Sequence, residues 1–157
     1  MMLQLTRKAD YALRLMVDVT AHRDGPIDTA TVAQRQEIPY QFLRKIVQTL
    51  VSTGLLVSER GLHGGLSLAR PPETISILDI IGAFGPPSLN RCTVIPPRCE
   101  LRDSCPVYPV WVEAQTQLER LLGRSYLSDL IQRQAKTGRT DRKRRPAREA
   151  TPAGAKS

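Results

Sequence analysis

Apolar residues recur every three or four positions in the first third of the chain, which predicts three consecutive amphipathic helices. Thr6 and Asp28, residue types that cap helix N-termini, precede the first and second of these segments. Pro39 suits the first turn of the third helix and Gly54 its end. The polar face of the first helix carries Arg7, Asp10, Arg14 and Asp18. The apolar stripe of the third helix consists of Phe42, Leu43, Ile46, Val47, Leu50 and Val51.

A β-hairpin is predicted directly after the third helix. Residues 55–57 suggest a short strand, the glycines between Gly61 and Gly65 a tight turn, and residues 66–69 an alternating return strand. Three helices followed by a hairpin is the element order of a winged helix-turn-helix, whose third helix fits the major groove of DNA. The predicted fold is therefore mainly α with a small β-hairpin wing.

The polar face of the third helix and the hairpin supply candidate DNA contacts. Arg44 and Lys45 suit guanine edges or phosphates, and Gln41 or Gln48 suits adenine edges. A polar helix face is also what simple solvation produces, so the winged-helix context decides in favour of DNA binding. The candidates are Tyr40, Gln41, Arg44, Lys45 and Gln48 on the helix and Arg60 and His63 on the wing.

The second half of the chain contains two further helical patterns. Ser76 can cap a helix that Gly85 ends. A long amphipathic stripe between residues 110 and 122 stops at Gly123, and Ser125 begins a last short helix. From the pattern alone, the long stripe is either ordinary core or a surface for a partner chain.

The only cysteines, Cys92, Cys99 and Cys105, lie in a proline-rich segment without helical or strand period, residues 85–109. Unstructured loops of this length are uncommon in compact domains and are usually functional or disordered. An odd number of thiols favours a metal centre over a disulfide framework. The spacing, C-x6-C-x5-C, fits structural zinc poorly, whereas thiolates suit iron–sulfur clusters. A cluster bound by four protein ligands would need one more from elsewhere.

The charge is concentrated near one end of the chain. Of the net charge of +8, residues 136–157 contribute eight Lys and Arg against two acids, whereas residues 1–135 carry 15 basic and 13 acidic residues. Such a tail is typical of disorder, and it either solubilises the protein or attracts nucleic acid non-specifically. No apolar run reaches the about 18 residues of a membrane span and no signal peptide is recognisable, so we expect a cytoplasmic protein without a membrane partner. The sequence lacks a catalytic constellation, so no enzyme is predicted.

Three strings resemble the Rrf-type bacterial winged-helix regulators, the family that includes the iron–sulfur cluster regulator IscR and the nitric-oxide sensor NsrR. They are LTRKADYALR, IPYQFLRKIVQTLVSTGLL and ERGLHGGLSLARPPETISILDII, and the likeness extends from Leu3 to about Gln134. It implies a homodimer that binds palindromic, double-stranded promoter DNA, as a repressor, under the control of a labile 4Fe–4S or 2Fe–2S cluster. It also implies a DNA-binding domain (1–84), a cluster loop (85–109) and dimerisation helices (110–135), which the basic tail predicted above to be disordered (136–157) follows.

The same resemblance suggests a fourth cluster ligand. Members similar to NsrR carry an aspartate in the first helix that reaches the cluster of the other subunit, and the matching residue is Asp10. The alternative is an ordinary surface pair between Asp10 and Arg14, four residues on. Members similar to IscR use a histidine where this chain has Tyr108. His63, Glu100 and Asp103 are lesser candidates.

Two other functions are compatible with three clustered thiols. The first is a cluster-free regulator whose cysteines sense oxidants directly. The second is an iron–sulfur electron carrier or assembly partner that does not read DNA. Metal content separates the first from a cluster-dependent regulator, and operator preference separates the second.

Overall fold

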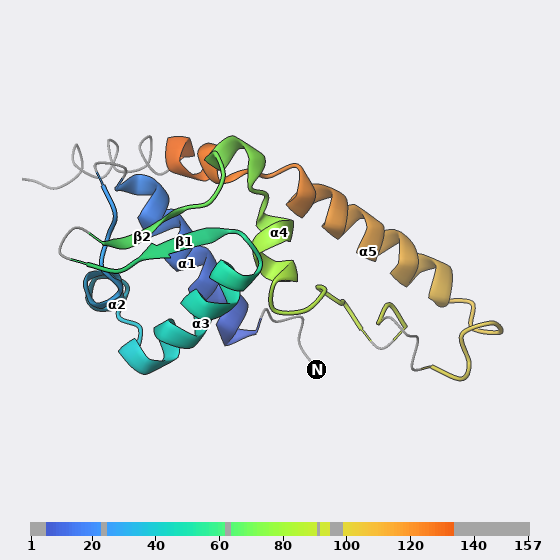
Figure 1. Ribbon diagram of the computed structural model, residues 1–157. Helices are drawn as coiled ribbons and strands as arrows, with labels where there is room; N and C mark the ends of the chain where they lie inside the picture. Colours follow the sequence, from blue (N-terminus) through green and yellow to red (C-terminus); the bar gives the residue numbers. More distant parts are fainter. Residues whose placement is uncertain (1–5, 23–24, 62–63, 91, 95–98, 134–157) are drawn as a thin grey trace, which may run out of the picture.

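A computed structural model describes residues 6–22, 25–61, 64–90, 92–94 and 99–133. The described part is mostly helical with one two-stranded antiparallel hairpin, and it confirms the predicted winged helix-turn-helix (Figure 1). His63 and the predicted basic tail lie outside the described residues. The elements are α1 (Arg7–Ala21), α2 (Thr29–Gln36), α3 (Tyr40–Ser52), β1 (Leu56–Glu59), β2 (Gly65–Leu68), a 3-10 turn (Pro72–Thr74), α4 (Ile77–Gly82) and α5 (Tyr108–Gly123), with residues 127–133 also helical.

The helix starts follow from side-chain caps, as predicted. Thr6 accepts a hydrogen bond from the Ala9 N–H at 3.3 Å. The Asp28 carboxylate accepts the N–H groups of Ala30 and Thr31, and Ser76 forms a reciprocal capping box on α4. Pro39 is the N-cap of α3 and not part of its first turn, and α3 begins without a side-chain cap.

One hydrophobic core joins the three N-terminal helices to the hairpin and to the C-terminal end of the described chain. Leu15 and Met16 of α1 and Leu43 of α3 are fully buried in it. Leu127, near the end of the described chain, is also fully buried in this core. Its N–H donates to the carbonyl oxygen of Ile75 at 3.0 Å. The last helical segment therefore packs on the winged-helix unit. Val51, predicted for the apolar stripe of α3, is 38% exposed, so the buried stripe is narrower than expected.

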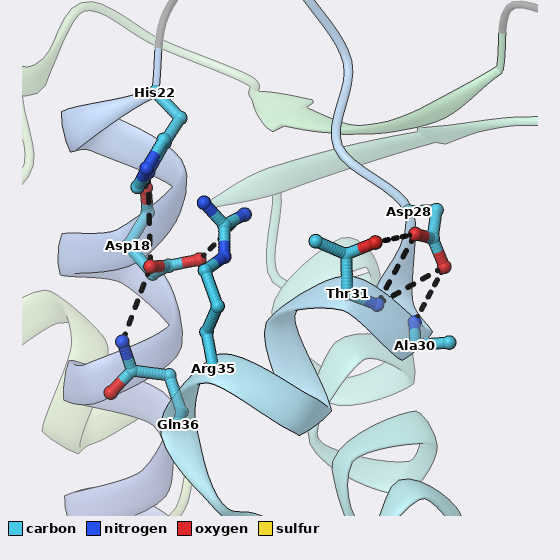
Figure 2. A network of polar contacts seen from close by, with 7 residues as sticks. All are labelled: Asp18, His22, Asp28, Ala30, Thr31, Arg35 and Gln36. Carbon is cyan, nitrogen blue, oxygen red and sulfur yellow. Dashed lines mark hydrogen bonds and ion pairs between the residues drawn. The ribbon is translucent and has the colours of Figure 1, made fainter. Parts of the chain in front are cut away.

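A buried polar network fixes α2 against α1 (Figure 2). Asp18 is only 5% exposed, which contradicts its predicted place on the polar face of α1. Its carboxylate accepts a hydrogen bond from Gln36 Nε2 at 3.2 Å and lies 3.3 Å from Arg35 Nη2. Arg14 donates to the backbone oxygen of Gln36, so two side chains of α1 hold the end of α2. Burying Asp18 is feasible because these groups replace much of its hydration.

The turn between α2 and α3 and the wing each depend on backbone geometry. Glu37 ends α2 in the left-handed region, with φ of 53°, a position that glycine fills at no steric cost. In the wing, Leu56 pairs with Leu68 and Glu59 with Gly65. A Cβ atom on Gly65 would lie 2.9 Å from the backbone of Ile27, which bridges to Leu66. The wing is thereby attached to the segment that leads into α2.

The long helix α5 extends away from the winged-helix unit in Figure 1. Val110 is 64% and Leu121 50% exposed, and among the residues of α5 only Gln115 is buried. A helix with so little buried apolar surface is not ordinary core. Within the described part of the chain, no helix combines the length and the apolar character needed to cross a bilayer.

Candidate DNA-binding face and thiol site

The predicted DNA contacts of α3 share one solvent-exposed face. Their side chains stand opposite the residues of α3 that are buried in the core. Arg60, directly after β1, is exposed as well, so the structure places six of the seven predicted contacts at the surface. The seventh, His63, lies outside the described residues. The exposed residues of α3 are Tyr40, Gln41, Arg44, Lys45, Gln48, Val51 and Ser52.

Lys8, a further cation that the sequence did not single out, lies beside this face. Lys8 of α1 and Lys45 of α3 line one hollow of about 280 Å³, whose apolar wall includes Phe42 and Phe84. The sequence of α3 contains no acidic residue. This edge of the molecule therefore attracts polyanions such as the DNA backbone. The sequence alone did not indicate Lys8 as a DNA contact, because only the fold brings α1 next to α3.

The three cysteines form no disulfide and are each half-buried. The pKa of the Cys92 thiol is raised, first by its partial burial and then by the charge of Cys99 and a hydrogen bond with it, with a smaller effect of Cys105. Cys92 therefore interacts with both other thiols. Within the described ranges, however, no three His, Cys, Asp or Glu side chains are arranged to hold a metal ion. The donor chemistry fits an iron–sulfur cluster, but the described loop is not a preformed cage.

Local hydrogen bonds shape the two ends of the cysteine loop. The Cys92 N–H donates to Asn90 Oδ1 at 2.9 Å, and the Thr93 hydroxyl donates to the Asn90 carbonyl oxygen at 3.1 Å. At the other end, the Cys105 carbonyl oxygen accepts the N–H of Tyr108, the first residue of α5, at 3.2 Å. Cys105 thus adjoins α5 directly.

The candidates for a fourth ligand differ in their exposure and in their contacts in the structure. Asp10 is exposed near the start of α1, and its predicted surface partner Arg14 instead contacts Gln36 and covers the Tyr11 ring at 5.6 Å. Glu100 and Asp103 are exposed at the surface, where Asp103 pairs with Arg102 at 3.9 Å.

The ring of Tyr108 is covered by the Arg102 guanidinium, 5.2 Å from the ring centroid. The position where relatives similar to IscR carry a histidine is therefore occupied by a cation–π pair. Asp10 keeps a free surface position, whereas Tyr108 is engaged within its own chain.

Fold and site define a class of protein, a DNA-binding winged-helix regulator. Comparisons with known proteins agree. The Rrf2 family, described as an iron-dependent transcriptional regulator, matches residues 5–133, and the chain belongs to this family. The transcriptional regulator IscR of Xenorhabdus nematophila is 30% identical over 134 residues, covering 84% of this chain and 81% of that protein.

Two solved structures of regulators have the same fold. IscR from T. potens superposes with a TM-score of 0.70 at 26% identity, covering 86% of this chain and 90% of that one. CymR, the global cysteine regulator of B. subtilis, also reaches 0.70 at 27% identity, covering 83% and 98%. The chain is thus an Rrf2-family DNA-binding transcription regulator.

Proposed function

We propose that the protein is a cytoplasmic homodimeric repressor whose affinity for promoter DNA is set by an iron–sulfur cluster on its three cysteines. One observation carries this proposal above all. The only three thiols of the chain lie on one loop that leads directly into α5, while a separate face of α3 is exposed. In this proposal, sensing and DNA reading belong to different parts of one small fold.

The exposed face of α3 supports sequence-selective reading of the major groove. Arg44 lies near the middle of this face, with Gln41 and Gln48 one turn to either side. Arginine pairs with guanine and glutamine with adenine through two hydrogen bonds each. Lys45 and Lys8 contact DNA phosphates at the edge of this face. Arg60, on the wing, contacts the neighbouring groove.

The exposure of α5 supports a dimer. A second copy of the chain would cover Val110 and Leu121, which lie on the same side of the helix and are 64% and 50% exposed. Helix pairing along an apolar face is the usual way to bury such a surface. A two-fold axis would place the two α3 helices in successive major grooves, about 34 Å apart. The operator is then a palindrome.

Cys92, Cys99 and Cys105 would hold the cluster, and Asp10 of the partner subunit would complete its ligands. When bound, a cluster supplies an iron centre that small molecules and oxidants can attack. An oxygen donor binds iron less tightly than a thiolate does, so Asp10 makes one position exchangeable. Loss of that contact frees α1 of one protomer from the loop of the other, and the distance between the two α3 helices changes.

A test of this ligand uses Asp10→Ala with Glu73→Ala as the control, since both carboxylates are exposed and Glu73 lies outside the cysteine loop. The visible absorption of the cluster should decay faster in Asp10→Ala than in the wild type, with the dimer intact. Glu73→Ala should behave as the wild type. Equal decay in both variants would exclude Asp10 as a ligand.

A second candidate function is a cluster-free thiol sensor, favoured by the absence of a preformed metal group among the described residues. In that case an oxidant such as hydrogen peroxide acts on the cysteines directly. Replacing all three cysteines by serine would then abolish the response to peroxide in metal-free protein. A cluster-dependent regulator predicts no such response from the metal-free form. Membership of the Rrf2 family argues against the electron-carrier alternative.

A further inference from the structure

The only buried residue of α5 is polar. Gln115 is 8% exposed, although apolar neighbours on the same helix remain open to solvent. Burial of a primary amide is unfavourable unless hydrogen bonds replace those it made to water. The partners of Gln115 therefore identify what this position is for.

Gln115 binds the backbone of the segment that leads to the first cysteine. Its Oε1 accepts the N–H of Leu89 at 3.0 Å, and its Nε2 donates to the carbonyl oxygen of Pro87 at 2.6 Å. Nε2 also donates to Glu119 Oε1, one turn further along α5, at 2.7 Å. Both amide hydrogens and the amide oxygen are thus used, and two of the three bonds cross to the other segment.

The segment bound in this way borders a hollow. The hollow has a volume of about 420 Å³, is partly open to solvent, and is lined by Pro86, Pro87 and Leu89 of the segment and by Leu118 and Leu122 of α5. Close-packed side chains normally hold a loop, and the hollow leaves part of this segment without them. The hydrogen bonds of Gln115 therefore carry much of the attachment.

The connection from this anchor to Cys92 is short. The N–H of Leu89 is held by Gln115, and the side chain of the next residue, Asn90, accepts the N–H of Cys92 at 2.9 Å. The Ser88 hydroxyl donates to the Asn90 carbonyl oxygen at 2.8 Å, which stiffens the same turn. A shift of Cys92 is transmitted through this turn to the side chain of Gln115 and so to α5.

We propose that Gln115 is a positioning residue that couples the place of Cys92 to α5. Gln115 has no contact with a thiol and acts only through the backbone of residues 87–89. The biological meaning of the coupling rests on the proposed function, in which Cys92 carries the signal and α5 joins the protomers. The coupling itself requires neither a cluster nor DNA.

The experiment measures the alkylation rates of the cysteines in reduced, metal-free protein. Iodoacetamide modifies each thiol, and mass spectrometry gives the rates for Cys92 and Cys105 in the same sample. Gln115→Ala is compared with the wild type and with Gln117→Ala. Gln117 is the matched control because it is exposed and its side chain bonds only within α5, to Glu113 and Arg120.

The ratio of the Cys92 rate to the Cys105 rate should rise about tenfold in Gln115→Ala, since two hydrogen bonds of ordinary strength hold the segment. Gln117→Ala should leave the ratio at the wild-type value. General loosening of the protein would raise both rates together, so the ratio isolates the anchor. An unchanged ratio in Gln115→Ala, or the same rise in Gln117→Ala, would overturn the proposal.

Two additions keep the test decisive. If Gln115→Ala does not fold, Gln115→Met retains the length of the side chain without its hydrogen bonds and should give the same rise. In the wild type, the Leu89 amide should exchange slowly with deuterated water, and fast exchange there would contradict the anchor. Failure of cluster binding would leave both readouts intact, so the two proposals are tested separately.

Discussion

Removal of the Asp18 carboxylate should destabilise the winged-helix unit by about 2 to 3 kcal/mol. A hydrogen bond to a charged acceptor contributes about 1.5 to 3 kcal/mol, and Gln36 supplies one. The ion pair with Arg35 adds about 1 kcal/mol, a reduced value because the Arg35 side chain is 33% exposed. Asp18 Oδ2 has no hydrogen-bond partner among the described residues, so the buried carboxylate is not fully compensated. Removing the carboxylate also removes the cost of burying its charge, so the net loss of stability stays near the lower end of the sum of these two contributions.

The assay is urea denaturation of Asp18→Ala at neutral pH. Asp103→Ala is the matched control, because its carboxylate also pairs with an arginine but is 99% exposed. We expect no measurable change in the control and a fall of about 2 to 3 kcal/mol in the free energy of unfolding of Asp18→Ala. A double-mutant cycle with Arg35→Ala should give a coupling of about 1 kcal/mol. A loss below about 0.5 kcal/mol in Asp18→Ala would refute the reasoning that the network holds α2 on α1.

Three further predictions concern the cap of α2, the wing and the reading face. The hydrogen bond from the Thr31 side chain, with smaller help from backbone N–H groups, lowers the pKa of Asp28 from its ordinary 3.8. Asp28→Ala should therefore cost about 1 kcal/mol at neutral pH, and its difference from the wild type in urea titrations should vanish as the pH falls through the lowered pKa. Gly65→Ala should destabilise the wing, whereas Gly82→Ala, with nothing within 4 Å of its Cβ position, should raise the melting temperature. Arg44→Ala should reduce the preference for operator over random DNA in competition binding, and unchanged preference would remove it from the reading face.

The helices, caps and hairpin could be predicted because they depend on local signals. Thr6, Asp28 and Ser76 precede apolar periods, and each caps the helix expected of it. The exposed face of α3 followed from the same period, with Val51 misassigned near the helix end. Asp18 was misplaced for a physical reason, since a carboxylate reads as surface unless its partners are known. Those partners, Arg35 and Gln36, are 17 and 18 residues away on α2.

The chemistry of the cysteine site could be predicted from the sequence, but the hydrogen bonds that join its loop to α5 could not. Three thiols in one loop indicated a soft metal or a redox function without any structure. The role of Gln115 could not be found, because its bonds go to backbone atoms of residues 26 and 28 positions earlier. Backbone partners leave no pattern in the side chains of a sequence. Only the fold shows that a polar residue is the buried one on α5.

The dependence of DNA affinity on a cluster can be measured on a single preparation of the protein. Protein purified without oxygen is analysed for iron and acid-labile sulfide, and the same sample is titrated against promoter fragments before and after cluster removal. We expect stoichiometric iron and sulfide and a change in DNA affinity on removal of the cluster. Selective DNA binding by protein that holds neither iron nor sulfide under these conditions would contradict it and assign the three cysteines to direct thiol sensing.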